Sequence, residues 1–173
     1  MATAERVLTA LAVIAIVAIV AIYPAIIRGQ GGQPSDTPLI VPFVASYLAL
    51  MAALLAVSLF TPAAWRPALR GAASAGLVFM GVLAAFTIGL AILVAAAPAV
   101  ASGVLAARAR PGGTTTASSG VAVLLAVALL VAGFEFSWSY LVCPASGESG
   151  GSTASFLGRG SSYDCDNGVL TVR

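Results

Sequence analysis

The chain alternates long apolar stretches with short polar ones, and the apolar stretches have the length that crosses a bilayer. A helix needs about 20 apolar residues to span roughly 30 Å of hydrocarbon. Such stretches lie approximately at residues 7–27, 39–60, 73–97 and 121–142. We therefore predict an all-α integral membrane protein, with about four transmembrane helices in residues 1–142 and a polar tail in residues 143–173.

The third apolar stretch is longer than one crossing requires. No charged residue occurs from Gly71 to Ala107, which is too long for one span and barely long enough for two. A turn in its middle calls for Gly, Asn, Asp or Pro, and the segment 86–90 offers only Gly89. The pattern predicts one long helix, kinked or broken around Pro98 and extended to Ala107. Five crossings or a re-entrant segment are the alternatives.

The remaining segments fit the connections and borders of membrane helices. Polar or proline-containing loops are expected at residues 29–38, 61–70 and 111–119. The first apolar run resembles a signal peptide, but it is too long and lacks a small-x-small cleavage site, so it is predicted to be retained. Trp65, Trp138 and Tyr140 stand at helix ends, where aromatic side chains anchor a helix at the headgroup level.

Composition agrees with the membrane class and excludes several functions. The chain is 60% hydrophobic and 8% charged, whereas a soluble domain carries about 25% charged residues. Its basic residues are eight arginines, scattered at helix ends rather than clustered, which argues against nucleic-acid binding. The absence of Lys and the abundance of Ala, Gly and Val indicate a GC-rich genome, and we expect a bacterial cytoplasmic membrane. No histidine is present, so we predict no metal, no cofactor and no catalytic residues.

The two cysteines, Cys143 and Cys165, both fall in the polar tail. Two thiols without a nearby histidine cannot complete a zinc site, and their spacing excludes a CxxC pair. A structural disulfide is the simplest interpretation, and closing a loop of this length contributes roughly 3 kcal/mol. Because disulfides persist in oxidising compartments, we predict that the tail is extracytoplasmic.

The distribution of arginines tests this orientation, and its result depends on the number of crossings. With four crossings and the tail outside, the six arginines that precede the tail balance, three on each side: inside Arg28, Arg108 and Arg110, and outside Arg6, Arg66 and Arg70. With five crossings, only Arg28 of these six lies outside and the other five lie inside, as the positive-inside rule prefers. Span length and turn chemistry favour four, so the prediction stays at four.

Glu135 is the only acidic residue inside a predicted span. Such a residue is a functional candidate because burying its charge is costly, but its place among aromatic residues near the helix end favours an interfacial anchor. With no Arg or Lys in the apolar part of another span, no ion pair within the bilayer is expected. In the tail, the segment 166–168 is interpreted as a turn leading into a strand at 169–172, because its spacing departs from a calcium loop.

Three function classes follow from this inventory. We expect foremost an accessory or structural subunit of a larger membrane complex, which packs against membrane lipids and partner subunits through small-residue helix faces. The small residues are densest in 71–76 and recur at Gly81, Ala84, Ala85 and Gly89. The alternative is a small oligomeric transporter or channel that uses Glu135. An enzyme acting on lipids is the third class, and it lacks an acid–base pair.

Overall fold

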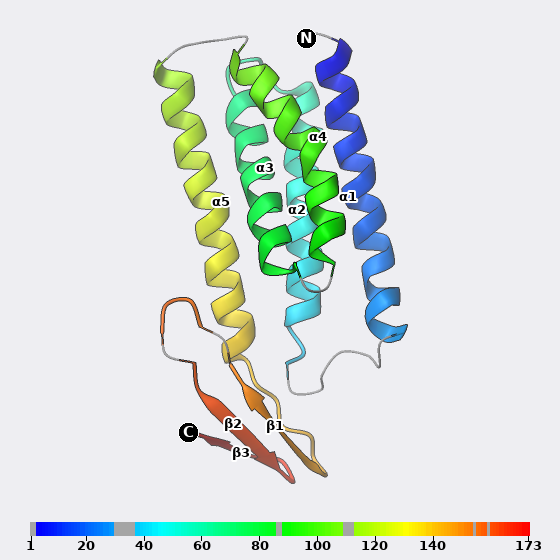
Figure 1. The fold of residues 1–173 in the computed structure, drawn as a ribbon. Helices are drawn as coiled ribbons and strands as arrows, with labels where there is room; N and C mark the ends of the chain where they lie inside the picture. Colours follow the sequence, from blue (N-terminus) through cyan, green and yellow to red (C-terminus); the bar gives the residue numbers. More distant parts are fainter. Residues whose placement is uncertain (1–2, 30–36, 86–87, 109–112, 154, 159) are drawn as a thin grey trace. The chain divides into compact units, whose positions relative to one another are not determined.

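The computed structural model describes residues 3–29, 37–85, 88–108, 113–153, 155–158 and 160–173. Most of the predicted loop at 29–38 and Arg110 therefore lie outside the described residues. The described part is mostly helical (Figure 1). Its elements are α1 (Thr3–Gly29), α2 (Ile40–Phe60), α3 (Arg66–Leu83), α4 (Gly89–Arg108), α5 (Gly113–Ser139), β1 (Glu148–Ser152), β2 (Ser162–Asp166) and β3 (Val169–Val172).

Four helices are long and apolar enough to cross a membrane. They are α1, α2, α4 and the part of α5 from Ala117 to Ser139. This confirms the prediction of a helical chain with four candidate spans. The helices α1, α2 and α5 overlap three of the predicted stretches, although α5 already begins at Gly113, where a loop was expected.

The single long helix predicted over Gly71–Ala107 is not found. The structure has two helices there, α3 and α4, which lie side by side and run in opposite directions (Figure 1). At the end of α3, the amide of Ala85 donates to the carbonyl of Val82 at 3.2 Å. At the start of α4, the amide of Gly89 donates to the carbonyl of Ala84 at 2.7 Å. A single glycine therefore suffices for this turn, and α4 continues through Pro98 as a helix.

Gly89 is required because two backbones meet at it. A Cβ atom at this position would overlap the carbonyl oxygens of Gly81 and Ala84. A Cβ at Gly81 would in turn come within 2.8 Å of the Leu93 side chain. The small residues of this region thus allow α3 and α4 to approach each other, which is how helices pack closely in lipid.

The chain divides into two compact units, and the first contains Met1–Tyr23 and Ser46–Leu130. Its fully buried apolar side chains come from all five helices: Ile16, Leu48, Met51, Leu55, Leu77, Met80, Ile92 and Leu130. Tyr47 links three of the helices. Its ring lies over Gly76 of α3, and its hydroxyl donates to the carbonyl of Ala126 in α5 at 3.0 Å.

The second unit contains Pro24–Ala45 and Val131–Arg173, including an antiparallel sheet of order β1-β2-β3. The predicted turn and final strand are confirmed: Asn167 and Gly168 have φ of 45° and 85° and connect β2 to β3. Two consecutive residues with positive φ match the twist of a tight hairpin, which explains the Asn-Gly pair. The first two strands were not predicted; β1 is mostly Ser and Gly, and β2 contains two Asp.

The turn between α3 and α4 gives the first prediction. We expect Gly89→Ala to lower the free energy of unfolding by about 1–3 kcal/mol, because the new methyl group meets backbone atoms that cannot move aside. The matched control is Gly103→Ala in the same helix, where a Cβ would meet Ser74 and Arg70 atoms only at 3.6 and 3.9 Å. Denaturant unfolding in detergent micelles measures both, and equal stability of the two variants would contradict the close approach at Gly89.

Candidate functional site

The first unit holds a buried arginine, Arg70, in the second turn of α3. Its Nε donates to the hydroxyl of Ser58 in α2 at 3.1 Å, and its Nη1 pairs with the carboxylate of Glu5 in α1. Its Nη2 is buried and has no hydrogen-bond partner. One guanidinium therefore connects three helices and keeps one donor unused.

Further polar groups line up beside this ion pair. Thr9, one turn after Glu5, donates to the Glu5 carbonyl at 2.8 Å, and Ser58 donates to Leu55 at 2.7 Å. Ser74, one turn after Arg70, has a buried hydroxyl without a partner. The arrangement can hold a fixed positive charge inside the helices, because Glu5 compensates it and the Ser58 hydroxyl accepts one of its hydrogen bonds.

The sequence prediction missed this pair. Glu5 and Arg70 were interpreted as charges flanking the spans, and no ion pair among the helices was expected. A signal was nevertheless present, since Arg70 shares the helical face of Ala73 and Leu77, both of which are fully buried. An arginine on the buried face of a helix requires an acidic partner, and Glu5 lies on the neighbouring α1.

The second unit holds Glu135 near the end of α5. Ser155 donates to both carboxylate oxygens at 3.1 and 3.0 Å, and the amides of Phe156 and Leu157 also donate to this side chain, the latter at 3.0 Å. The carboxylate thus binds the loop between β1 and β2 to the helix. Because every one of these donors is neutral, they solvate the charge without cancelling it.

Aromatic rings support the same attachment. Phe134 contacts Phe43 of α2 and Phe156 of the loop edge to face, with ring centroids 5.3 and 6.2 Å apart. Phe134 therefore packs between two segments of the second unit. Of the predicted anchors, Trp65 and Tyr140 are exposed and Trp138 is half-buried. Their role at the headgroup level stays a prediction.

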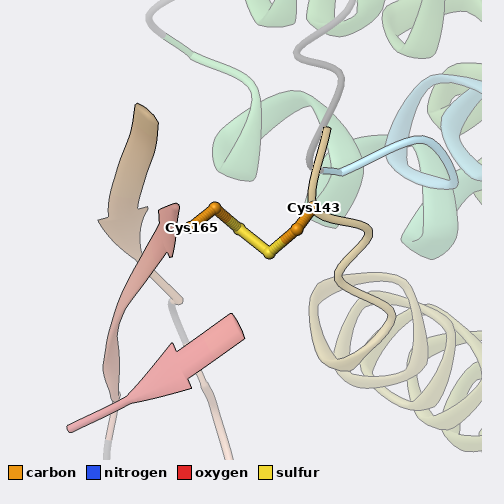
Figure 2. The surroundings of a disulfide bond; sticks show 2 residues. All are labelled: Cys143 and Cys165. Atoms are coloured by element: carbon orange, nitrogen blue, oxygen red, sulfur yellow. A yellow bond between two sulfur atoms is a disulfide. The ribbon is translucent and has the colours of Figure 1, made fainter. Parts of the chain in front are cut away.

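The predicted disulfide is present and links Cys143, four residues after α5, to Cys165 in the central strand (Figure 2). Cys165 and Tyr163 are the buried residues of β2, and their partners in the register, Leu170 and Val172, lie on the same face of the sheet. Between this face and the end of α5 is a cavity of about 310 Å³, which we call the tail recess. Its walls are formed by Glu135, Trp138, Ser139, Leu141, Thr153, Ser155, Ser161, Tyr163, Leu170 and Val172.

A separate groove of about 610 Å³ lies in the first unit, among α2, α3 and α5. No charged side chain lines it. Comparisons with family models, curated proteins and solved structures found no match for this chain. Within the described residues, no group of three or more Cys, Asp or Glu side chains could hold a metal ion.

The Glu5–Arg70 pair gives the second prediction. We expect Glu5→Gln to lower the free energy of unfolding by about 3–5 kcal/mol, because it leaves a buried charge without compensation. The double variant Glu5→Leu/Arg70→Met should recover most of the loss, since it removes both charges. The control is Arg6→Gln. Arg6 is an exposed neighbour of Glu5, so this substitution should change the free energy of unfolding by at most about 0.5 kcal/mol. Unfolding in mixed micelles is the measurement, and a loss as large in Arg6→Gln as in Glu5→Gln would refute the assignment.

Proposed function

We propose that the chain is an accessory or structural subunit of a larger membrane complex. The observation that carries this proposal is the apolar groove among α2, α3 and α5. On one side it is bordered by Leu50, Met51, Leu54, Trp65, Ala68, Leu69 and Ala72, and on the other by Ala117, Ser118, Val121, Ala122, Leu125, Ala126 and Leu129. A partner helix that lies in this groove would contact three helices of the chain at once.

The small side chains of the groove favour a helix as its occupant. In lipid, apolar character alone does not drive helices together, because acyl chains are equally apolar. Alanines do promote association, since they let two backbones approach, and α5 offers three of them at Ala117, Ala122 and Ala126. The glycines of α3 already face other helices of the chain. We therefore place the partner-binding surface at the groove, and no longer at the small residues of α3 that the sequence suggested.

The ionisable groups of the helices also favour an accessory role. Arg70 is paired with Glu5, and the Glu135 carboxylate binds the loop between β1 and β2. A transporter needs polar groups that can exchange partners along a pathway. Because these groups hold structural contacts, the alternative of a transporter that uses Glu135 has less support than the accessory subunit.

We further propose that α3, which is not among the four candidate spans, makes a fifth crossing, with the N-terminus inside and the tail outside a bacterial cytoplasmic membrane. The Glu5–Arg70 pair brings the beginnings of α1 and α3 to one end of the first unit, and the antiparallel α4 returns to that end at Arg108. This end therefore carries four described arginines: Arg6, Arg66, Arg70 and Arg108. Arg28 belongs to the opposite end of α1. The positive-inside rule then places the arginine-rich end in the cytoplasm.

The third prediction concerns the two termini. Five crossings place them on opposite sides of the membrane, whereas four crossings place them on the same side. We expect a reporter fused at the N-terminus to be active only in the cytoplasm, and one fused at the C-terminus only outside it. The measurement is reporter activity in intact cells. As the control, a reporter active only in the cytoplasm and one active only outside it are each fused at each terminus. Both termini on one side would exclude five crossings.

The fourth prediction tests the subunit proposal. The tagged chain, purified from its native membrane in mild detergent, should bring down one or more membrane proteins in a fixed stoichiometry. Ala122→Phe, which fills the groove, should reduce that yield about tenfold. Ala128→Phe is the matched control, because Ala128 is exposed on the same helix and does not line the groove. Purification of the chain alone, or equal yields from both variants, would contradict the proposal.

A further inference from the structure

The tail recess combines apolar and aromatic side chains with hydroxyl groups and one charge that no ion pair cancels. Leu141, Leu170 and Val172 line it together with the aromatic residues Trp138 and Tyr163. Glu135 is the only charged residue in the lining. The two ion pairs among the described residues are Glu5–Arg70 and Asp164–Arg173, and neither includes Glu135. The recess therefore presents a negative charge beside apolar and aromatic groups.

The carboxylate retains capacity for a ligand. Oε1 accepts from Ser155, Phe156 and Leu157, whereas Oε2 accepts only from Ser155. The three donor groups, one shared hydroxyl and two amides, use three of the about four acceptor positions of a carboxylate, so one position on the Oε2 side is left for a further donor. A cationic donor would complete this set and cancel the charge that the neutral donors leave.

The aromatic residues, the hydroxyl groups and the volume of the recess together favour a small ammonium compound as the ligand. Aromatic faces attract cations, Trp most strongly and Tyr less so, and ligands with an ammonium group are recognised in this way. Other polar groups of the recess are already engaged: Thr153 donates to the Ser161 carbonyl at 3.1 Å, and Ser139 donates to Phe136 at 2.9 Å. A volume of about 310 Å³ suits a headgroup-sized molecule.

We propose that the tail recess is a binding site for an ammonium group, held by Glu135 and by the aromatic residues Trp138 and Tyr163. Two sources share this chemistry, the ethanolamine headgroup of a phospholipid and a free small amine. The fixed geometry of the recess comes from the disulfide at Cys165 and from the hydrogen bonds of Ser155. The proposal does not depend on the partner subunit or on the number of crossings.

The experiment uses Trp138 as its own reporter. The chain has two tryptophans, so Trp65→Phe leaves Trp138 as the single emitter. In a neutral detergent, the full chain is titrated with ethanolamine and with dihexanoyl phosphatidylethanolamine, while dihexanoyl phosphatidylglycerol serves as the control without an ammonium group. We expect a saturable change in Trp138 emission with both ammonium compounds and none with the control. The opposite variant, Trp138→Phe, retains Trp65 and should show no change.

Variants test the charge of the Glu135 carboxylate. Glu135→Gln should weaken binding by about tenfold or more, because the ligand loses a charge-assisted hydrogen bond. Glu148→Gln is the matched control, because Glu148 is an exposed carboxylate of β1 that does not line the recess, and its affinity should stay within about threefold of the parent. Val172→Lys carries its own ammonium into the recess and should compete with the added ligand, which tests the site even if Glu135→Gln fails to fold.

Each outcome bears on the proposal. Tighter binding of the phospholipid than of ethanolamine identifies a headgroup site, and equal binding identifies a site for free amines. The proposal is overturned if no ligand saturates, if phosphatidylglycerol binds equally well, or if Val172→Lys leaves the affinity unchanged. Failure of these titrations would leave the co-purification result unaffected, so the two proposals fail separately.

Discussion

A guanidinium that is shielded from water must be compensated where it lies, and this constraint organises the first unit. Arg70 cannot reach solvent, so α1 supplies a carboxylate and α2 supplies a hydroxyl. Three helices are thereby held in one register at their ends. The remaining packing follows, because the glycines of α3 admit Tyr47 on one side and the start of α4 on another. A purely apolar interface would fix neither the depth nor the rotation of these helices as tightly.

The second unit differs, since a three-stranded sheet of short strands has almost no core of its own. Only Tyr163 and Cys165 of β2 are buried. Covalent and polar attachments take the place of a core: the disulfide fixes the central strand, and Glu135 fixes the loop between β1 and β2. Small domains without enough apolar surface depend on such cross-links. The recess remains between these attachments because neither of them fills the space behind the sheet.

Sequence reasoning located the candidate spans, the disulfide and the last hairpin because each has a local signature. Hydrophobic runs identify candidate membrane helices, the only two cysteines lie together in a polar tail, and Asn167-Gly168 specifies a tight turn. The turn between α3 and α4 escaped detection because its one requirement, a glycine at 89, looks like ordinary composition in a chain so rich in small residues. The Glu5–Arg70 pair joins residues 65 positions apart. No local pattern predicts such a contact, although the buried helical face of Arg70 indicated that a partner was needed.

The tail also implies an order of events during synthesis. The hairpin of β2 and β3 closes over the two residues Asn167 and Gly168, whereas the disulfide and the Glu135 contacts close loops of about 20 residues. Short loops close first, so we expect the hairpin to form before either attachment. All three strands follow α5 in the chain. The sheet is consequently synthesised after all five helices, so closure of the Cys143–Cys165 disulfide marks a chain whose helices have already been made.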